Sequence, residues 1–149
     1  MPCQNGHTVY DHWNQELSES ERLQIYHKHK NSDVFLCSTN ALTLDGQLIN
    51  LDGSGNRVSS LIFGPKKIIV IAGVNKIVDN VESGIARVKN VVAPELYRHK
   101  NAPAPCAKTG YCINCHPPVK QCRALVILEA RPRINTDFHI ILVGENLGI

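Results

Sequence analysis

Residues 67–76 read Lys67-Ile68-Ile69-Val70-Ile71-Ala72-Gly73-Val74-Asn75-Lys76. The nearly continuous apolar run follows a Gly64-Pro65 break and is typical of a strand covered on both faces, as the central strand of a parallel sheet is. Apolar residues then recur at helical spacing, and Asn75 is placed to cap the helix that they predict. They are Ile77, Val78, Val81, Ile85 and Val88. The stretch therefore predicts a central strand followed by a tight turn into a helix.

The rest of the sequence predicts short elements of an α/β domain around this strand. Ser18-Glu19-Ser20-Glu21 has the form of a capping box and predicts a helix from about residue 19 to 29. Two apolar runs, residues 42–44 and 48–51, are separated by Asp45-Gly46-Gln47 and predict a hairpin. A short helix is expected at about residues 58–63. Further strands are expected at residues 33–37, 124–128 and 138–143, the first of them buried.

Polar side chains follow two of these strands at their C-terminal ends, where α/β sheets commonly bind ligands. Ser38-Thr39-Asn40 follows the strand at residues 33–37, and Asn75 and Lys76 follow the central strand. Lys76 is suited to hold an anion, although lysines that open helices are usually only solvated. The alternative for residues 38–40 is a turn satisfied by its own side chains. The sequence leaves both interpretations open.

The loop Asp52-Gly53-Ser54-Gly55-Asn56-Arg57 precedes the short predicted helix. Such a glycine-bearing loop exposes backbone N–H groups that bind phosphate or carboxylate, and Arg57 could add a bidentate clamp. It is neither a Walker loop nor a complete GxGxxG motif, because Val58 stands where the third glycine would be. A tight turn in which Asp52 or Asn56 caps the helix explains the same residues equally well.

Four of the six cysteines lie within 17 residues, and their spacing is C-x5-C-x2-C-x6-C. They are Cys106, Cys112, Cys115 and Cys122. Gly110, Pro117 and Pro118 let the backbone turn several sulfurs toward one point. Four thiolates are the usual ligands of an iron–sulfur cluster, which is the first interpretation, and they also suit structural zinc, Zn being the alternative. Disulfides or free thiols are the third interpretation, and the spacing alone does not name the metal.

The composition indicates one globular domain over residues 1–149, since 43% of the 149 residues are hydrophobic and can form a single core. A net charge of +3, without aromatic residues among the basic ones, argues against nucleic acid as a partner. Met1 to His7 lack the features of a leader peptide, and no apolar run reaches membrane-spanning length, so we expect a cytoplasmic protein. The N-terminal histidines show no metal-ligand spacing and are expected to be exposed. They are His7, His12, His27 and His29.

Several motifs, in register from about Asp33 to Gly148, resemble the LUD-domain family of lactate-utilisation proteins. The matching segments are Ser38–Thr43, Asp52–Val58, Phe63–Lys67, Asn75–Val78, Pro105–Gly110, and the cysteines Cys112, Cys115 and Cys122. The resemblance implies a three-layer α/β fold with a mostly parallel sheet, like that of the NagB/RpiA/CoA-transferase group. It also implies an association with the oxidation of lactate to pyruvate in an iron–sulfur protein complex.

The same resemblance suggests site residues and indicates that the N-terminal part of the domain has no counterpart in this chain. The four cysteines of the loop at residues 105–122 become the metal candidates, and no catalytic residue is carried over. The residues expected to bind a small anionic metabolite are Asn40, Gly53, Gly55, Asn56, Arg57, Asn75 and Lys76. Family members carry further helices and a Gly-Gly-Ser segment upstream of the region matching Asp33, which the divergent residues 1–32 do not provide. The chain therefore resembles the C-terminal part of a LUD domain.

Two functions from different classes agree with these features. The first is a redox-associated subunit in the oxidation of lactate or a related organic acid, with redox protein subunits as partners and an iron–sulfur cluster on the cysteines. The second is a non-enzymatic anion-binding or assembly module with structural zinc. In both cases a sheet without its N-terminal cover exposes apolar side chains such as Ile69 and Ile71, so we expect a homo-oligomer.

Overall fold

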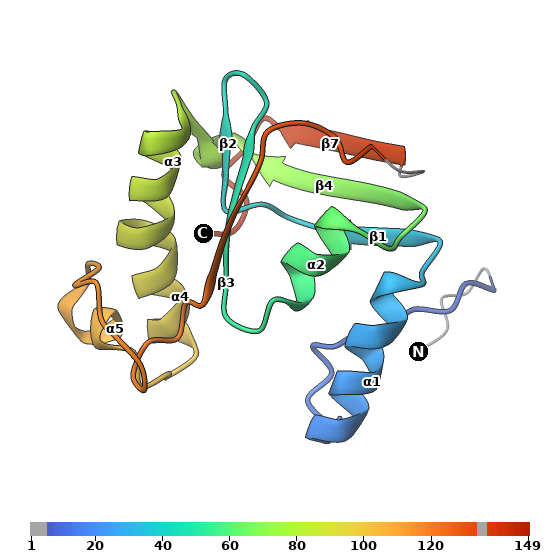
Figure 1. Ribbon diagram of the computed structural model, residues 1–149, viewed down its shortest axis with the longest axis horizontal. Coiled ribbons are helices and arrows are strands. Elements are labelled where there is room, and N and C mark those ends of the chain that lie inside the picture. The colour runs from blue at the N-terminus through green and yellow to red at the C-terminus, as the bar shows by residue number, and fades with distance from the viewer. Residues whose placement is uncertain (1–5, 134–136) are drawn as a thin grey trace.

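The computed structural model describes residues 6–133 and 137–149, so Met1 to Asn5, used above to argue against a leader, lie outside the described residues. Three parallel strands form the first sheet, in the order β1-β4-β7 (Figure 1). They are β1 (Val34–Cys37), β4 (Lys67–Gly73) and β7 (Asp137–Val143). The apolar run at residues 67–72 is therefore the central strand of this sheet, as predicted.

The second sheet has the order β5-β2-β3-β6. Its strands are β2 (Ala41–Thr43), β3 (Leu48–Asp52), β5 (Ile77–Val78) and β6 (Ala124–Leu128). β2 and β3 form the predicted hairpin, and Gly46 in its turn has a φ of 87°, which favours glycine. β6 pairs antiparallel with β3, whereas β5 pairs parallel with β2. Parallel pairings outnumber antiparallel ones in the described strands, as predicted.

Two hydrophobic clusters join the sheets and helices into three layers. In the first, Phe35, Ile68 and Val70 of the β1-β4-β7 sheet pack with Leu42 and Leu48 of the β2–β3 hairpin. In the second, Ala41 and Ile49 on the other face of the hairpin pack against Val88. Val88 begins the π-helical turn η2 (Val88–Val92), which joins helix α3 (Val81–Arg87) to helix α4 (Ala93–His99). The second sheet thus lies between the first sheet and this helical layer, and the predicted three-layer α/β class is confirmed (Figure 1).

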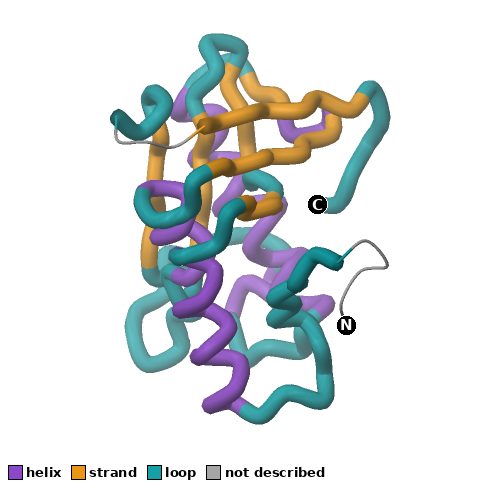
Figure 2. Tube along the Cα trace, turned by 90° about the vertical axis from the view of Figure 1, so that its right-hand side faces the viewer, coloured by secondary structure: helices purple, strands orange, loops and turns teal. Residues whose placement is uncertain are grey.

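The remaining helices are α1 (Glu19–Lys30), α2 (Asn56–Ile62) and α5 (Pro105–Thr109). The predicted capping box begins α1: Ser18 Oγ accepts from the Glu21 N–H, and the Glu21 carboxylate accepts from the Ser18 N–H. Viewed from the α1 side, the strands gather toward one end of the molecule and α1 lies below them (Figure 2). The prediction of exposed histidines is wrong for His29, which is buried against Phe35 and hydrogen-bonds the Tyr10 carbonyl at 2.9 Å.

The helix predicted to start at Asn75 begins later. Residues Val74–Lys76 form a 3-10 turn, η1, and Ile77 and Val78 then form β5 against β2. Asn80 caps α3 instead, with its Oδ1 accepting from the Ser83 N–H at 2.9 Å. The prediction failed because the helical spacing of Ile77 and Val78 was overridden by strand pairing with β2.

The β1-β4-β7 sheet leaves one face without cover in the described part of the chain. The prediction of a buried strand at residues 33–37 is wrong, because β1 is an edge strand in which Val34 and Leu36 are 50% and 63% exposed. On the same face Ile69 and Ile71 are half-buried and Ile141 is 47% exposed. This is the apolar face expected from the sequence, and self-association through it stays a prediction. No helix in the described residues is both long and apolar enough to cross a membrane.

Candidate functional site

The C-terminal ends of the three parallel strands meet at one edge of the β1-β4-β7 sheet. Ser38 follows β1, Val74–Lys76 follows β4, and residues 144–148 follow β7. The Lys76 ammonium donates to Ser38 Oγ at 2.9 Å, and the Val74 N–H donates to the Glu145 carbonyl at 3.2 Å. The predicted convergence of Ser38 with Lys76 at the carboxyl ends of the parallel strands is therefore present, whereas the Gly53–Arg57 loop, predicted at the same place, follows β3, which pairs antiparallel in the second sheet.

Arg57, in the first turn of α2, holds the loop after β1 against the end of β3. Its Nη1 donates to the Ser38 carbonyl at 2.9 Å and to Asn50 Oδ1 at 2.7 Å. Its Nη2 donates to Asn40 Oδ1 at 2.8 Å and to the Leu51 carbonyl at 3.2 Å. Arg57 and Lys76 thus lie on the same side of the sheet and both contact Ser38, but the Arg57 guanidinium is largely occupied by the protein's own oxygens.

Arg87, in the last turn of α3, is a third cation at this site that the sequence analysis did not single out. Its Nε and Nη2 donate to the Asn75 carbonyl at 3.1 and 2.9 Å, and its Nη1 donates to the Asn40 carbonyl at 3.0 Å. Arg87 therefore ties the turn after β4 to the loop after β1. Its position in an ordinary helical pattern carried no signal of this role.

Lys76 is affected by both arginines. Burial lowers the pKa of the Lys76 ammonium, and the positive charges of Arg87 and Arg57 lower it further. Burial likewise lowers the pKa of Arg57, against the opposing effect of Asp52. Next to Arg57, burial raises the pKa of the Cys37 thiol to about 12, so this thiol stays protonated at neutral pH. The site carries an excess of positive charge held in a poorly solvated place.

The glycine loop is arranged around the Asp52 carboxylate. Asp52 Oδ1 accepts from the N–H groups of Ser54 and Gly55 at 3.1 and 3.0 Å, and Oδ2 accepts from the Val58 N–H at 3.3 Å. Of the two interpretations left open by the sequence, the turn capped by Asp52 describes this geometry. Gly55 adopts a φ of 81°, and Asn56 begins α2, where its carbonyl accepts from Ser59 and Ser60 hydroxyls. Anion binding by these loop residues stays a prediction.

The cysteine loop, residues 105–122, packs beside η2 and α4. Cys106 is buried in α5, and Cys112 is held by a hydrogen bond from its N–H to Asn90 Oδ1 at 3.2 Å. Burial raises the pKa of the Cys106 thiol, and negative charge on Cys122, Cys115 and Cys112 would raise it further. All four thiols are free and within electrostatic reach of Cys106. Among the described residues, no three His, Cys, Asp or Glu side chains are close enough to hold a metal ion as they stand.

Tyr97 of α4 connects the cysteine loop to the glycine loop. Burial raises the pKa of its phenol to about 12, with contributions from Cys122, Cys106, Asp52 and then Cys115. The backbone is also joined here, because the Arg123 N–H donates to the Asp52 carbonyl at 2.8 Å. A methyl group on Gly53 would lie 3.0 Å from the Gln121 carbonyl and 3.9 Å from the Tyr97 hydroxyl. The predicted metal and anion regions are therefore neighbours, and Tyr97 was missed because its segment shows no clear periodicity.

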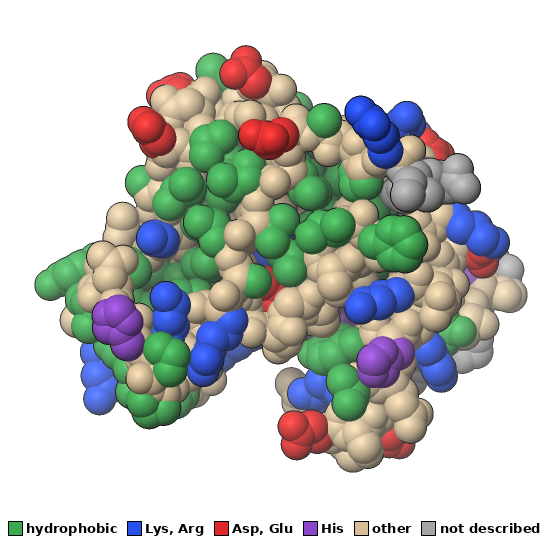
Figure 3. Space-filling model, in the orientation of Figure 1, with side chains coloured by type: hydrophobic (Ala, Val, Ile, Leu, Met, Phe, Trp, Pro, Cys, Tyr) green, Lys and Arg blue, Asp and Glu red, His purple; other side chains and the backbone are tan. Residues whose placement is uncertain are grey.

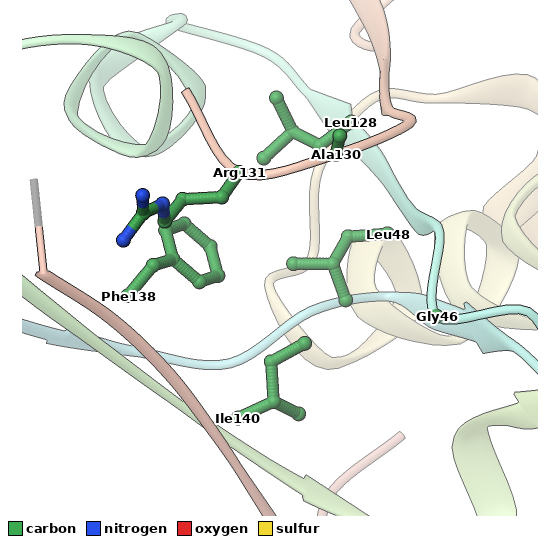
Figure 4. A pocket seen from close by; sticks show the side chains of 7 residues that line it. All are labelled: Gly46, Leu48, Leu128, Ala130, Arg131, Phe138 and Ile140. Atoms are coloured by element: carbon green, nitrogen blue, oxygen red, sulfur yellow. The ribbon is translucent and has the colours of Figure 1, made fainter. Parts of the chain in front are cut away.

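A separate apolar hollow of about 280 Å³ lies between the hairpin and β7 (Figure 4). Phe138, Ile140, Leu48 and Leu128 line it, with Arg131 at its edge. In Figure 3 apolar side chains gather in the upper middle of the face, and Lys and Arg side chains lie both over the end formed by α4 and α5 and along the opposite side of the view. None of the predicted site residues lines this hollow.

No curated protein matches this chain. A solved structure of a DUF162 family protein from Deinococcus radiodurans is similar at 16% sequence identity and a TM-score of 0.42, covering 79% of this chain and 58% of the other. The chain thus spans less than two thirds of the length of that protein. The family model of the LUD domain matches residues 3–143, almost the whole sequence, and the chain therefore belongs to the LUD domain family.

Proposed function

We propose that this LUD-domain chain is a redox-associated subunit in the oxidation of lactate or a related small organic acid, and that Cys106, Cys112, Cys115 and Cys122 bind one iron–sulfur cluster. The observation that carries the proposal is that these four free thiols lie in one loop, with Cys122, Cys115 and Cys112 within electrostatic reach of Cys106. A metal centre stabilises such neighbouring thiols as thiolates.

The donor set fits an iron–sulfur cluster by its chemistry. Four cysteine sulfurs are its usual ligands, and hydrogen bonds to the sulfurs tune its reduction potential. The Asn114 N–H donates to Cys112 Sγ at 3.4 Å, which is a bond of this kind. When bound, such a cluster accepts and releases single electrons. The chain's own residues would position it: Asn90 fixes the backbone at Cys112, and α5 buries Cys106.

The neighbouring polar site supports a small acid as the other reactant. The cysteine loop contacts Asp52 and Gly53, which lead directly into Arg57 and the cationic site at the ends of β1 and β4. An organic acid is an anion at neutral pH and is attracted by the three cations there. Redox protein subunits are the expected partners, because a single one-electron centre needs a donor or acceptor outside itself.

Anaerobic reconstitution with iron and sulfide tests the proposal. Broad visible absorption that bleaches on reduction is expected, and single Cys→Ser variants at the four positions should weaken it strongly. Cys37→Ser is the matched control, since Cys37 lies beside Arg57 and its spectrum should match that of the unchanged protein. Metal-free thiols after careful anaerobic handling would overturn a shared metal site.

A zinc-bound, non-enzymatic anion-binding module is the second candidate. The observation favouring it is that the site around Ser38 is made of cations and amides, and the acid there, Asp52, is already bonded to backbone N–H groups. Such a site binds an anion, and the Asp52 carboxylate is not free to act as a base. Colourless protein with one zinc per chain, in the same reconstitution, would select this candidate.

A further inference from the structure

Lys76 is a buried cation with spare hydrogen-bond donors. The residue is 6% exposed, and an ammonium group has three N–H donors. Ser38 Oγ is the acceptor for one of them, and no second acceptor contacts this ammonium within residues 6–133 and 137–149. A buried charge without compensation is costly, so proteins rarely retain one without a reason.

The surroundings of Lys76 lack the negative charge that such a group normally pairs with. The charged groups that act on its ammonium are Arg87 and Arg57, both positive. Of the acids that act on the two arginines, Asp52 lies 4.0 Å from Arg57 Nε and is itself bonded to three backbone N–H groups, and Glu95 acts on Arg87. The described side chains at this site therefore do not supply the negative charge that would balance the Lys76 ammonium.

The N–H groups of the two arginines are used mainly on the protein itself. Arg57 uses four of its N–H groups on protein oxygens and directs the fifth toward Asp52. Arg87 uses three of its five on the carbonyls of Asn75 and Asn40. Both arginines hold the backbone in place around Lys76 and raise the local positive potential.

We propose that the Lys76 ammonium, together with the Ser38 hydroxyl, binds the carboxylate of a small organic acid. This inference deepens the proposed function, on which it rests for the substrate class, by naming the group that recognises the acid. The two spare N–H donors of Lys76 suit two carboxylate oxygens and one negative charge, and the Ser38 hydroxyl, which donates to the Thr39 carbonyl at 3.4 Å, would turn to the carboxylate on binding. A phosphate dianion would bring more oxygens and more charge than these donors balance, so the site favours a monocarboxylate.

The segment from Glu145 to Gly148 forms an outer wall over this site. Asn75 holds it twice, through Nδ2 to the Gly148 carbonyl at 3.0 Å and through Oδ1 from the Leu147 N–H at 3.1 Å. A methyl group on Gly148 would lie 3.6 Å from Lys76 Nζ. The segment is exposed and held by few hydrogen bonds, so local opening gives an anion access to the buried ammonium.

Binding measurements on the full metal-free chain test the proposal. Sodium L-lactate, sodium pyruvate and inorganic phosphate are each titrated calorimetrically against the unchanged protein, Lys76→Met, Ser38→Ala and Lys66→Met. Lactate or pyruvate should bind saturably, and Lys76→Met should weaken binding by more than about tenfold, with a smaller loss for Ser38→Ala. Lys66 is the matched control, because it pairs with Asp33 at the opposite end of β4 and its loss should leave binding unchanged.

A pH titration of the Lys76 side chain by carbon-13 NMR covers the case in which Lys76→Met fails to fold. Bound lactate should raise the pKa of this ammonium, because a carboxylate stabilises its charged form. Absence of binding by both acids, equal binding by Lys76→Met, or binding of phosphate alone would overturn the proposal. These titrations use metal-free protein, so they test anion binding separately from the cluster. Anion binding can be absent while the visible spectrum still shows a cluster, and anion binding can be present when the spectrum shows none.

Discussion

Two adjoining regions of this domain use their polar groups in opposite ways. In the Arg57 cluster, formed by Ser38, Asn40, Asn50, Asp52 and Arg57, the charged groups are bonded to the protein itself. The buried Nδ2 of Asn50 is an exception, since it has no partner within the described residues. In the cysteine loop the thiols are mostly unused: within the described residues, hydrogen bonds to a cysteine sulfur of this loop involve Cys112. Apart from the Asn50 amide nitrogen, the first region satisfies its own polar groups, whereas the second has sulfur atoms left for a ligand.

The largest difference should appear when each region loses one polar group. Arg57→Ala removes donors from two backbone carbonyls and two side-chain amides, of which Asn50 is buried, and it leaves Asp52 without its nearby cation. We expect the free energy of unfolding to fall by about 3 kcal/mol. Cys112→Ser in metal-free protein should change it by less than about 0.5 kcal/mol, because the thiol is only half-buried. Urea denaturation of both variants measures this, and equal losses would contradict the contrast.

The contact between the two regions can be disturbed at Gly53. Gly53→Ala places a methyl group 3.0 Å from the Gln121 carbonyl, a backbone atom that must move away. We expect a loss of about 1–2 kcal/mol in unfolding free energy and weaker metal binding, because the cysteine loop is displaced. Gly144→Ala is the matched control, since a methyl group there meets no atom within 4 Å. If thermal melts show the two variants losing the same stability, the loops are not packed as described.

The elements set by local sequence were predictable, and those set by tertiary contacts were not. The apolar run at residues 67–72 and the Asp45-Gly46 turn carry their structure in a few neighbouring residues, and both form as expected. Asn75 failed as a helix cap because pairing of Ile77 and Val78 with β2 outweighed their helical spacing. The edge position of β1 likewise depends on which strands lie beside it. An apolar run in the sequence carries no information about these neighbours.

The candidate site shows the same division. The meeting of Ser38 with Lys76 was predictable, because the carboxyl ends of parallel strands share one edge of a sheet. The arrangement around Asp52 was one of two open interpretations, since the same loop sequence caps a helix or offers its N–H groups to an anion. Arg87 and Tyr97 were missed because their importance lies in what they contact across the chain. Spacing brought the cysteines into one loop but could not give the separation of their sulfurs.

Alkaline pH should expose a further difference through Cys37. Burial raises its pKa to about 12 in the folded protein, against an ordinary value near 9. The unfolded chain therefore releases this proton above pH 9 while the folded chain retains it, so stability is lost as pH rises through this window. We expect a loss of about 1 kcal/mol between pH 9 and pH 10 that Cys37→Ser removes. An unchanged pH slope in Cys37→Ser, measured by urea denaturation, would assign the loss to other groups.

The smallest effect on stability is expected at Tyr97, where the two regions meet. Its hydroxyl has no hydrogen-bond partner recorded within the described residues, although burial and then Cys122, Cys106 and Asp52 raise the pKa of the phenol to about 12. Tyr97→Phe in the metal-free protein should therefore change the free energy of unfolding by less than about 0.5 kcal/mol. Leu96→Ala, on the same helix, is a comparison that removes packing and leaves the hydroxyl in place.

The metal-loaded protein gives Tyr97 a second and more telling measurement. A phenol that lies among thiols stays protonated, so it can donate a hydrogen bond to a cluster sulfur once those thiols are bound as thiolates. Such a bond stabilises the reduced, more negative state, and Tyr97→Phe should therefore lower the reduction potential while leaving the visible spectrum in place. An unchanged reduction potential would mean that the Tyr97 hydroxyl does not bond to the cluster and interacts with the Asp52 region instead. The two regions would then be joined only through the backbone bond from Arg123 to Asp52.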